Sequence, residues 1–476
     1  MDCIEWTLRE AVSRIACRDV TVVEYTDQLL RRCGEQARLN AFISLPVPEV
    51  RRAAREADRL IRRGEALGPL HGIPLVVKDN IDVAGMPTTG GTPALRAHRP
   101  PRSAPVVSSL LRAGALVLGK SNMHELAYGV TGDNAAFGPV RNPYDNKRLA
   151  GGSSSGTAAA VSARLAPAGL GTDTGGSVRI PAALCGVAGL RPSMGRYSQR
   201  GVMILSPTRD TVGPMARNVS DLALLDAVLT GQPHAAAVVA PSSPLRIGVP
   251  RNPCFRSVDR SVTDVVERRL AQLEEHGATL IEVDLPPRVE ELTAAAGFPI
   301  VFHETPPSLT RYLRATEPAM EFAELVEQVA SADVREMLGS LLPPGAVDPA
   351  VYGAALGTHR PELEGRFAHY FRQNDLSAIA FPTVPVTACQ AEETSVVPVN
   401  GTAEPTFLTY IRNTNVASVI GWPGLSVPAG LDANGLPVGI ELDGPPGSEA
   451  LLLSLGRHCE ELWGPLPAPA THGETL

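Results

Sequence analysis

Two glycine-flanked serine clusters lie within residues 151–181, and serines in such settings can act as nucleophiles. Residues 151–155 read GGSSS, and residues 175–177 read GGS. Glycine has no Cβ atom, so neighbouring backbone N–H groups can converge beside a serine oxygen and stabilise an oxyanion. Either segment can also be an ordinary turn, and 151–155 can also cap a helix, whereas the P-loop pattern is absent from it. Acyl transfer would require a base near one of the serines.

Lys78 is the candidate for this base, because no histidine stands in a recognisable catalytic context. Lys78 ends the apolar run 73–77 and precedes Asp79 and Asn80. A lysine that a buried strand carries into the interior loses hydration, which favours its neutral, basic form. Taken alone, the same residue can also be a surface lysine whose stem lies along apolar surface.

Apolar runs that alternate with helical patterns must position these residues. The runs at 74–77, 115–118 and 166–170 predict strands, and the segments 105–113, 158–165 and 219–229 predict helices. The pattern returns later in the chain, with strands predicted at 245–249, 279–283, 378–381, 425–427 and 438–441. This alternation predicts an α/β core around a mixed, mainly parallel sheet.

We predict one domain over residues 1–476. Its N-terminal region is predicted to be helical, because Thr7–Glu10 and Thr21–Glu24 fit the capping-box pattern. Helical patterns also fill the middle of the chain, with breaks expected at Pro306–Pro307 and Pro343–Pro344. The predicted regions are a helical start (1–66), a catalytic core (67–233), a linker (234–244), a variable, mainly helical insertion that shapes the substrate pocket (286–375) and a C-terminal part of the core (376–465).

Composition excludes several classes of partner. The formal net charge of −7 gives no basic field for nucleic acid or an anionic membrane. The start MDCIEWTLRE lacks the pattern of a secretory signal, and no apolar run reaches the length of a membrane span, so we expect a soluble cytoplasmic protein. The 7 cysteines are scattered and never form CxxC, which favours reduced core thiols over disulfides or a metal site.

Taken together, these motifs resemble those of the amidase signature family. The similar segments are GIPLVVKDN at 72–80, GGSS at 151–154, GTDTGGSVRIPAALCG at 171–186 and TNVASVIGWPGLSVPAG at 414–430. The resemblance begins near residue 5, and its wording is most similar to the mandelamide and indoleacetamide hydrolases, which cleave small arylalkyl primary amides. It implies the amidase signature fold, in which helices cover both faces of the central sheet.

The resemblance also implies a role for each residue of a Ser–cis-Ser–Lys triad. Ser177 would be the nucleophile, Ser153 the bridging serine after a cis peptide bond, and Lys78 the general base. The backbone N–H groups of Thr174, Gly175, Gly176 and Ser177 would form the oxyanion hole. The residues expected to support this site without reacting are Ser154, Asp173 and Arg179.

Pocket residues are expected on two segments. Tyr128, Gly129 and Val130 would lie beside the triad and line the acyl pocket, together with Ile180. The insertion would supply the rest, including Phe298, Phe302 and His303. The substrates would be a small amide and water, with no cofactor and no metal, and esters, anilides and carbamates undergo the same acyl transfer. A homodimer is the candidate assembly.

Three alternatives remain within this resemblance. The amidotransferase subunit that makes glutaminyl-tRNA carries a glutamine after the SxR of the motif, where this chain has Ile180. The fatty acid amide hydrolases of animals bring an N-terminal membrane helix, for which the sequence gives no signal. A non-catalytic, partner-binding subunit is the third, and the intact Lys78, Ser153 and Ser177 argue against it.

Overall fold

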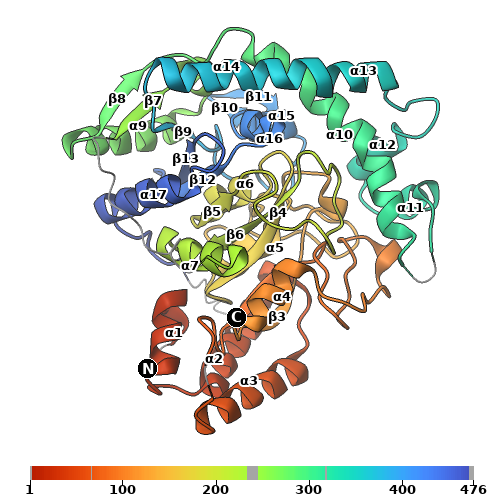
Figure 1. The fold of residues 1–476 in the computed structure, drawn as a ribbon, viewed down its shortest axis with the longest axis vertical. Coiled ribbons are helices and arrows are strands. Elements are labelled where there is room, and N and C mark those ends of the chain that lie inside the picture. Colours follow the sequence, from red (N-terminus) through yellow and green to blue (C-terminus); the bar gives the residue numbers. More distant parts are fainter. Residues whose placement is uncertain (1–2, 66, 233–244, 317–318, 471–476) are drawn as a thin grey trace.

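An 11-stranded sheet joins segments from both halves of the chain (Figure 1). The computed structural model describes residues 3–65, 67–232, 245–316 and 319–470, so the predicted linker at 234–244 lies outside the described residues. The strand order is β1 (Phe42–Ser44), β3 (Leu116–Ser121), β2 (Pro74–Lys78), β4 (Ala168–Asp173), β6 (Thr211–Ala216), β5 (Ala188–Arg191), β12 (Gly424–Leu431), β13 (Pro437–Asp443), β9 (Ala378–Pro382), β7 (Arg246–Val249) and β8 (Thr279–Glu282). A separate hairpin pairs β10 (Val396–Val399) with β11 (Thr402–Pro405).

The sheet is mixed, as predicted, and its parallel pairs form two blocks. β2 runs parallel to β3 and β4, and β7 runs parallel to β8 and β9. Antiparallel ladders join the strands between these blocks, from β4 through β6, β5, β12 and β13 to β9, and also join β1 to β3. The connection between β12 and β13 is too short for a parallel crossover, which explains the antiparallel pairing of these two strands.

Helices cover both faces of the sheet. The longer helices are α1 (Leu8–Ala16), α2 (Val22–Glu35), α3 (Val47–Arg62), α4 (Pro105–Arg112), α5 (Ser155–Ser162), α6 (Arg179–Cys185), α7 (Val219–Thr230), α9 (Arg260–Glu275), α10 (Val289–Leu313), α11 (Phe322–Gln328), α12 (Ala332–Gly339), α14 (Arg360–Gln373) and α17 (Glu449–Trp463). Shorter ones are α8 (Arg251–Cys254), α13 (Pro349–Ala354), α15 (Thr406–Ile411) and α16 (Asn415–Ile420). Both capping boxes predicted in the N-terminal region are confirmed, at the starts of α1 and α2.

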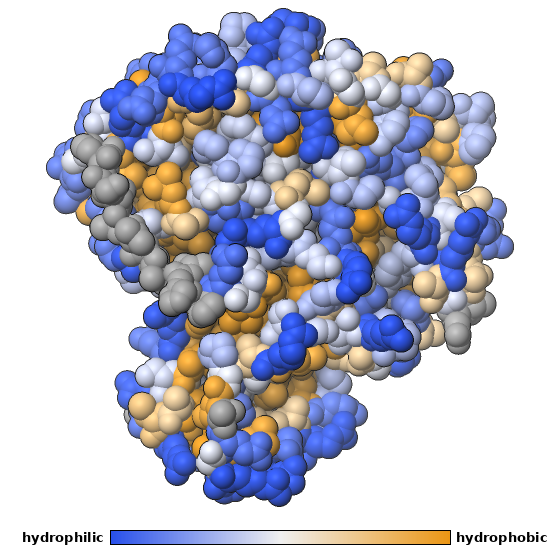
Figure 2. Space-filling view, viewed as in Figure 1, coloured by the Kyte–Doolittle hydropathy of each residue, from blue (hydrophilic) through white to orange (hydrophobic). Residues whose placement is uncertain are grey.

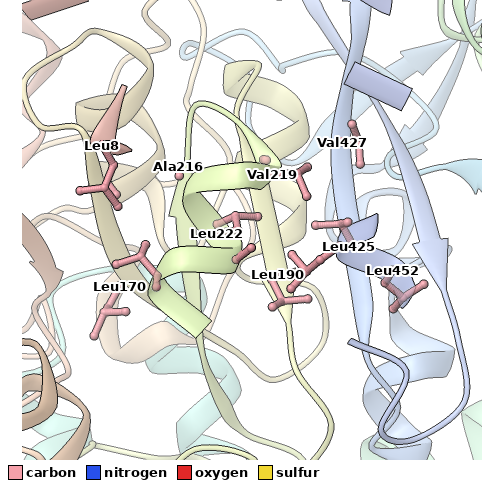
Figure 3. Packing of buried hydrophobic residues seen from close by; sticks show 14 of the residues in the cluster. Leu8, Leu170, Leu190, Ala216, Val219, Leu222, Leu425, Val427 and Leu452 are labelled. Atoms are coloured by element: carbon pink, nitrogen blue, oxygen red, sulfur yellow. The ribbon is translucent and has the colours of Figure 1, made fainter. Parts of the chain in front are cut away.

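Strand β4 shows how its sequence separates the two faces. Its residues read AGLGTD, so apolar side chains alternate with glycines. Leu170 lies on one face, near Leu8 of α1 in the apolar cluster seen in Figure 3. On the other face, a Cβ atom on Gly169 would lie 2.9 Å from Thr157 of α5, and one on Gly171 would lie 2.6 Å from the hydroxyl of Ser154. These glycines therefore allow α5 and the serine loop before it to approach the sheet closely.

The core on the α7 side collects residues from distant parts of the sequence. Figure 3 shows Leu190 of β5 and Leu425 of β12 beside Leu222 of α7 and Leu452 of α17, with Leu8 of α1 near Leu170. All of these side chains are fully buried. Burying a leucine contributes roughly 1.5–3 kcal/mol, so this cluster fixes the strands that end at the candidate site.

The middle of the chain is helical, as predicted, but one expected break is wrong. α10 runs unbroken from Val289 to Leu313 although it contains Pro306 and Pro307. Its first half packs in one apolar cluster with α14 and α16, and its second half packs in another with α11 and α12. This packing on both halves holds the helix continuous despite the missing N–H groups. The break at Pro343–Pro344 is confirmed, since these residues lie between α12 and α13.

Hydrophilic residues cover most of the face seen in Figure 2, and hydrophobic residues gather where the N-terminal helices meet the rest of the chain. Among the described residues, none of the helices combines the length and apolar character needed to cross a bilayer. At the carboxyl ends of β2 and β4 lie Lys78 and Asp173.

Candidate active site

Lys78 is the last residue of β2, between β3 and β4, and is fully buried. Its Nζ donates to Ser153 Oγ at 2.7 Å and to Thr172 Oγ1 at 2.8 Å, with the Thr172 carbonyl at 3.4 Å. Burial lowers the pKa of Lys78 to about 7, although the negative charges of Asp173 and Asp210 act in the opposite direction. The amine is thus poised to be neutral near physiological pH.

Ser153 lies in the loop immediately before α5. The peptide bond between Gly152 and Ser153 is cis, which confirms the expectation from the family resemblance. The side chain of Ser153 is fully buried, and its carbonyl accepts a hydrogen bond from the N–H of His124 at 3.2 Å. The Ser153 hydroxyl therefore contacts Lys78 from a fixed main chain.

Ser177 lies between the end of β4 and the start of α6. Ser177 is 7% exposed and lines a cavity. The N–H of Ser154 donates to the Ser177 carbonyl at 3.1 Å, so the two serine loops meet. The structure therefore brings together the two clusters that the sequence separates.

Ser154 fastens the serine loop to β4. Its hydroxyl donates to the Thr172 carbonyl at 3.2 Å and accepts from the Thr172 N–H at 3.2 Å. Residues 152–156 read GSSSG, which fits the GxSxG pattern of a nucleophile elbow centred on Ser154. Both hydroxyl bonds of Ser154 go to the strand, and its side chain is fully buried.

Asp173 organises the loop that follows β4. Its carboxylate accepts hydrogen bonds from the N–H groups of Gly176 (2.9 Å) and Val178 (3.2 Å) and pairs with Arg179 (3.1 Å) and Arg191 (2.9 Å). Burial alone would raise the pKa of Asp173, but the two guanidinium groups outweigh it and hold this pKa well below its usual value. Asp173 is thus a charged anchor for the loop that carries Ser177.

Arg179 connects the same loop to the C-terminal part of the sheet. Besides Asp173, it binds Glu441 of β13 at 2.7 Å, the carbonyl of Thr414 at 3.0 Å and Ser418 of α16 at 2.8 Å. All of these groups are fully buried, so removing one partner would leave an uncompensated charge. Asp173 and Arg179 therefore join the loop after β4 to β13 and α16.

The structure corrects one of the four predicted oxyanion donors. The N–H of Gly176 is already bound to Asp173, and Gly176 is absent from the cavity lining. In the part of the chain that the structure describes, the N–H groups of Thr174, Gly175 and Ser177 have no protein acceptor, and all three residues line the cavity. The sequence could not reveal this difference, because it depends on how each peptide plane is turned.

The cavity beside Ser177 is mainly apolar. Tyr128, Gly129 and Val130 line it, and so do Phe298 and Phe302 of α10. The remaining lining residues are Ala127, Thr174, Gly175, Leu205, Arg209, Val301, Met337, Phe407, Ile411 and Asn415. The insertion therefore contributes to the cavity wall through α10 and α12, and aromatic rings from α10 and α15 face the same space.

Two predicted pocket residues do not line this cavity. Ile180 is fully buried on α6, where it packs with Leu184 and Val384 in an apolar cluster, because the turn of the helix after Ser177 directs it into the core. His303 lies on α10 but stacks on Tyr352, with ring centroids 4.0 Å apart. Both predictions are therefore wrong for this cavity.

Sequence reasoning missed several residues of the site. Thr172 contacts Lys78 directly, and Arg209 and Asn415 line the cavity with polar groups. Thr172 lies two residues after Leu170, so the alternation along 168–173 placed it on the same face as that apolar residue, and no motif marked it as polar and buried. Arg209 comes next to the loop after β4 only through the antiparallel pairing of β4 with β6, which a single sequence does not show.

A second buried lysine, Lys120, lies on β3 next to the strand that carries Lys78 but has different partners. Residues 114–121 read GALVLGKS, which fits the P-loop pattern, yet 116–121 form β3, and the next element is a single 3-10 turn at Glu125–Ala127 instead of the α-helix that a P-loop opens. Lys120 Nζ is 3.1 Å from Asp79 Oδ1, and both side chains are fully buried. The motif is therefore a false match, and Lys120 is half of an ion pair.

The arrangement has the parts needed for acyl transfer: a lysine with a lowered pKa, a serine in contact with it, and a second serine in an apolar cavity with unused N–H donors. Among the described residues, there is no group of three or more side chains with the spacing of metal ligands.

Comparison with known proteins identifies the family. The family model described as Amidase matches residues 24–453, so the chain belongs to the amidase family. The protein is thus an amidase, a hydrolase of carbon–nitrogen bonds. It is 39% identical over 455 residues to the indoleacetamide hydrolase of Agrobacterium vitis, with 96% of each chain covered. It is 40% identical over 484 residues to the mandelamide hydrolase of Pseudomonas putida, with 98% of this chain and 94% of that one covered.

The fold agrees with this assignment. The crystal structure of native peptide amidase from Stenotrophomonas maltophilia superposes with a TM-score of 0.83 at 29% identity, over 98% of this chain and 99% of that one. The predicted amidase signature fold is therefore confirmed.

Proposed function

We propose that this amidase hydrolyses small aryl or arylalkyl primary amides through an acyl-enzyme on Ser177. The observation that carries the proposal is the 2.7 Å contact between Lys78 Nζ and Ser153 Oγ, next to a cavity that Ser177 lines. Burial lowers the pKa of Lys78 to about 7, so a neutral amine is available to accept a proton. The triad assignment thus rests on contacts as well as on the family motif.

In the proposed first half-reaction, Ser177 attacks the amide carbon while its proton passes to Ser153 and the Ser153 proton passes to Lys78. The carbonyl π electrons move to the oxygen, where the N–H groups of Thr174, Gly175 and Ser177 can stabilise the negative charge. The tetrahedral intermediate then collapses, the C–N bond breaks, and the proton returns along the same path to the leaving nitrogen. Ammonia departs and the acyl group remains on Ser177.

In the second half-reaction, water takes the place of ammonia. Its proton passes through Ser153 to Lys78 as its oxygen attacks the ester carbon, and the collapse of this second intermediate returns the proton to Ser177. The products are a carboxylic acid and the free enzyme. All proton transfers use the same pair, Lys78 and Ser153, so no separate acid is needed.

The aromatic lining of the cavity favours a substrate with an aryl acyl group. Phe298 lies near Phe302 and Phe407, with ring centroids 5.5 and 6.5 Å away, and Tyr128 adds a fourth ring to the lining. Offset or tilted aromatic contacts at such distances contribute about 0.5–1.5 kcal/mol beyond area burial. The names of the two relatives, which act on indoleacetamide and mandelamide, point to the same class of substrate. Aryl esters, anilides and carbamates fit the same chemistry.

A panel of substrates and one variant test the proposal. The panel contains phenylacetamide, an anilide, an aryl ester, an aryl carbamate and glutamine, and the mass of the trapped intermediate should show the acyl group on Ser177. Ser177→Ala should fold, lose all turnover and lose labelling by a fluorophosphonate. Amide hydrolysis at the wild-type rate by Ser177→Ala would refute the triad. A preference for glutamine would favour an amidotransferase-like glutaminase, and no labelling of the wild type would favour a non-catalytic subunit.

A further inference from the structure

Arg209 contacts the loop that carries the proposed oxyanion donors. Its Nη2 donates to the carbonyl of Thr174 at 3.1 Å and to Asn415 Oδ1 at 2.7 Å. Its Nη1 donates to the carbonyl of Gly297 at 2.6 Å. One guanidinium group thus joins the loop after β4 to α16 and to α10, and α10 supplies part of the cavity wall.

The register of the sheet explains this position. β4 and β6 are antiparallel, with Asp173 opposite Thr211, so the residues before β6 lie beside those after β4. Arg209 precedes β6 by two residues and therefore reaches Thr174 and Gly175. Its own carbonyl accepts a hydrogen bond from Arg191 Nη2 at 2.7 Å, which fixes its main chain.

The contact with Thr174 determines how one peptide plane is turned. The Thr174 carbonyl and the Gly175 N–H belong to the same trans peptide unit and point in opposite directions. With the carbonyl held by Arg209, the Gly175 N–H points away from the guanidinium, and no acceptor within the described ranges pairs with it. If this peptide rotated, a carbonyl oxygen would take the place of a proposed oxyanion donor.

The next peptide unit is fixed by different residues. Thr414 Oγ1 donates to the Gly175 carbonyl at 2.7 Å, and the Gly176 N–H donates to Asp173 at 2.9 Å. This plane is thus held at both ends by the protein, whereas the plane before it is held only at its carbonyl. A single contact on the Thr174 carbonyl therefore has more control over a catalytic donor than any contact in the next unit.

The surroundings of Arg209 keep its guanidinium group charged and fixed beside the cavity. It is 3% exposed, and it is the one charged side chain among the described residues that line the cavity. Burial and the neighbouring Arg191 lower its pKa to about 10, which leaves it charged at neutral pH. Its third anchor, Gly297, directly precedes Phe298, whose ring lines the cavity.

We propose that Arg209 is a positioning residue that orients the Gly175 N–H toward the reaction and ties this orientation to the acyl wall on α10. The inference rests on the proposed function, because it assumes an oxyanion formed next to Ser177. Arg209 acts through the peptide that it holds and has no need to touch the substrate.

The test compares Arg209→Met and Arg209→Lys with the wild type on phenylacetamide. Methionine fills similar space without donors, so kcat should fall by about 10- to 100-fold, less than the roughly 100- to 1,000-fold for complete removal of an oxyanion donor, with KM changed less than about threefold. Lysine keeps one charged donor and should give an intermediate kcat. An arylboronic acid, which forms a tetrahedral adduct on serine, should lose affinity for Arg209→Met by a factor close to that in kcat, while phenylacetic acid should bind as before.

Arg246→Met is the matched control, because Arg246 also donates to two backbone carbonyls, those of Asp375 and Asn374, but lies at the start of β7. Its kcat should equal that of the wild type. Unchanged kcat in a folded Arg209→Met, or a loss confined to KM, would overturn the inference. If Arg209→Met fails to fold, Arg209→Lys decides by the same split of kcat and KM. Failure of the wild type to label at Ser177 would instead refute the proposed function.

Discussion

Lys78 Nζ lies 2.7 Å from Ser153 Oγ, and Lys78 forms no ion pair with any carboxylate among the described residues. The other buried lysine, Lys120 on the neighbouring strand β3, is 3.1 Å from Asp79 and so has a compensating charge. Of these two buried lysines, one has a carboxylate partner and the other has none. The lysine without a carboxylate partner is the one in contact with a serine, which is the arrangement that a base requires.

The first prediction concerns the pH dependence of activity. A base must be neutral to accept a proton, and Lys78 loses its own proton as the pH rises through its pKa of about 7. We therefore expect kcat/KM for phenylacetamide to rise about tenfold per pH unit below pH 7 and to level off above it. Burial raises the pKa of Asp210 only to about 6, so its titration lies on the acid side of this limb. Stopped assays from pH 5 to 9 measure the profile, and an optimum near pH 5 would contradict a neutral lysine base.

The second prediction concerns Thr172, which accepts a hydrogen bond from Lys78 Nζ at 2.8 Å. An acceptor stabilises the ammonium form, so Thr172→Val should lower the pKa of Lys78 further and move the midpoint of the acid limb below that of the wild type. Asn80, which also binds this hydroxyl, keeps its contact with the Met203 carbonyl.

Thr26→Val is the control for this shift. Thr26 is also fully buried but lies on α2, away from the site, so its variant should keep the wild-type profile. The comparison requires only the pH dependence of kcat/KM for the three proteins. An upward movement of the midpoint in Thr172→Val, or no movement, would show that Thr172 does not act on the charge of Lys78.

The third prediction separates two adjacent glycines. Gly176 has a φ of +132°, and a Cβ atom there would lie 2.2 Å from Thr414 Oγ1. Gly176→Ala should therefore lower the free energy of unfolding by about 1–3 kcal/mol, the typical cost of such a strained conformation. A Cβ atom on Gly175 would meet its nearest neighbour, Asn415 Oδ1, at 3.6 Å, an ordinary contact. Thermal melts of both alanine variants should show a loss for Gly176→Ala alone, and equal losses would contradict this account of the loop.

The sequence was sufficient to single out the residues of the proposed triad but not the orientation of the groups around them. Lys78, Ser153 and Ser177 stand in local motifs, and the strands and helices that carry them follow from apolar periodicity. The Gly176 N–H was misassigned because its partner depends on the turn of a peptide plane. Ile180 was misassigned because the helix after Ser177 turns it into the core.

Contacts between distant segments were equally hidden from the sequence. Arg209 reaches the loop after β4 through strand pairing, and the register of that pairing requires the folded sheet. α10 passes through Pro306 and Pro307 because two separate clusters pack against its halves, an effect that outweighs local propensity. Such contacts form only when distant segments meet in the folded chain, so no local sequence pattern could predict them.

The last prediction concerns the aromatic wall. Phe298 faces the cavity and lies near Phe302 and Phe407, so Phe298→Ala removes the ring between its two neighbours. An aryl acyl group would lose contact area there, whereas a small acyl group would not. We expect kcat/KM for phenylacetamide to fall by about 10- to 100-fold, as expected for the loss of 1–3 kcal/mol of apolar contact, with that for propionamide changed far less.

Phe367→Ala provides the comparison for this variant, since Phe367 is also a buried ring of the helical region but packs on Trp422, away from the cavity lining. It should lower stability without altering the ratio of the two substrates. An equal loss on phenylacetamide and propionamide in Phe298→Ala would mean that the ring supports the fold of α10 and does not select the acyl group. A changed ratio in Phe298→Ala alone would place aryl recognition on the wall that the insertion contributes.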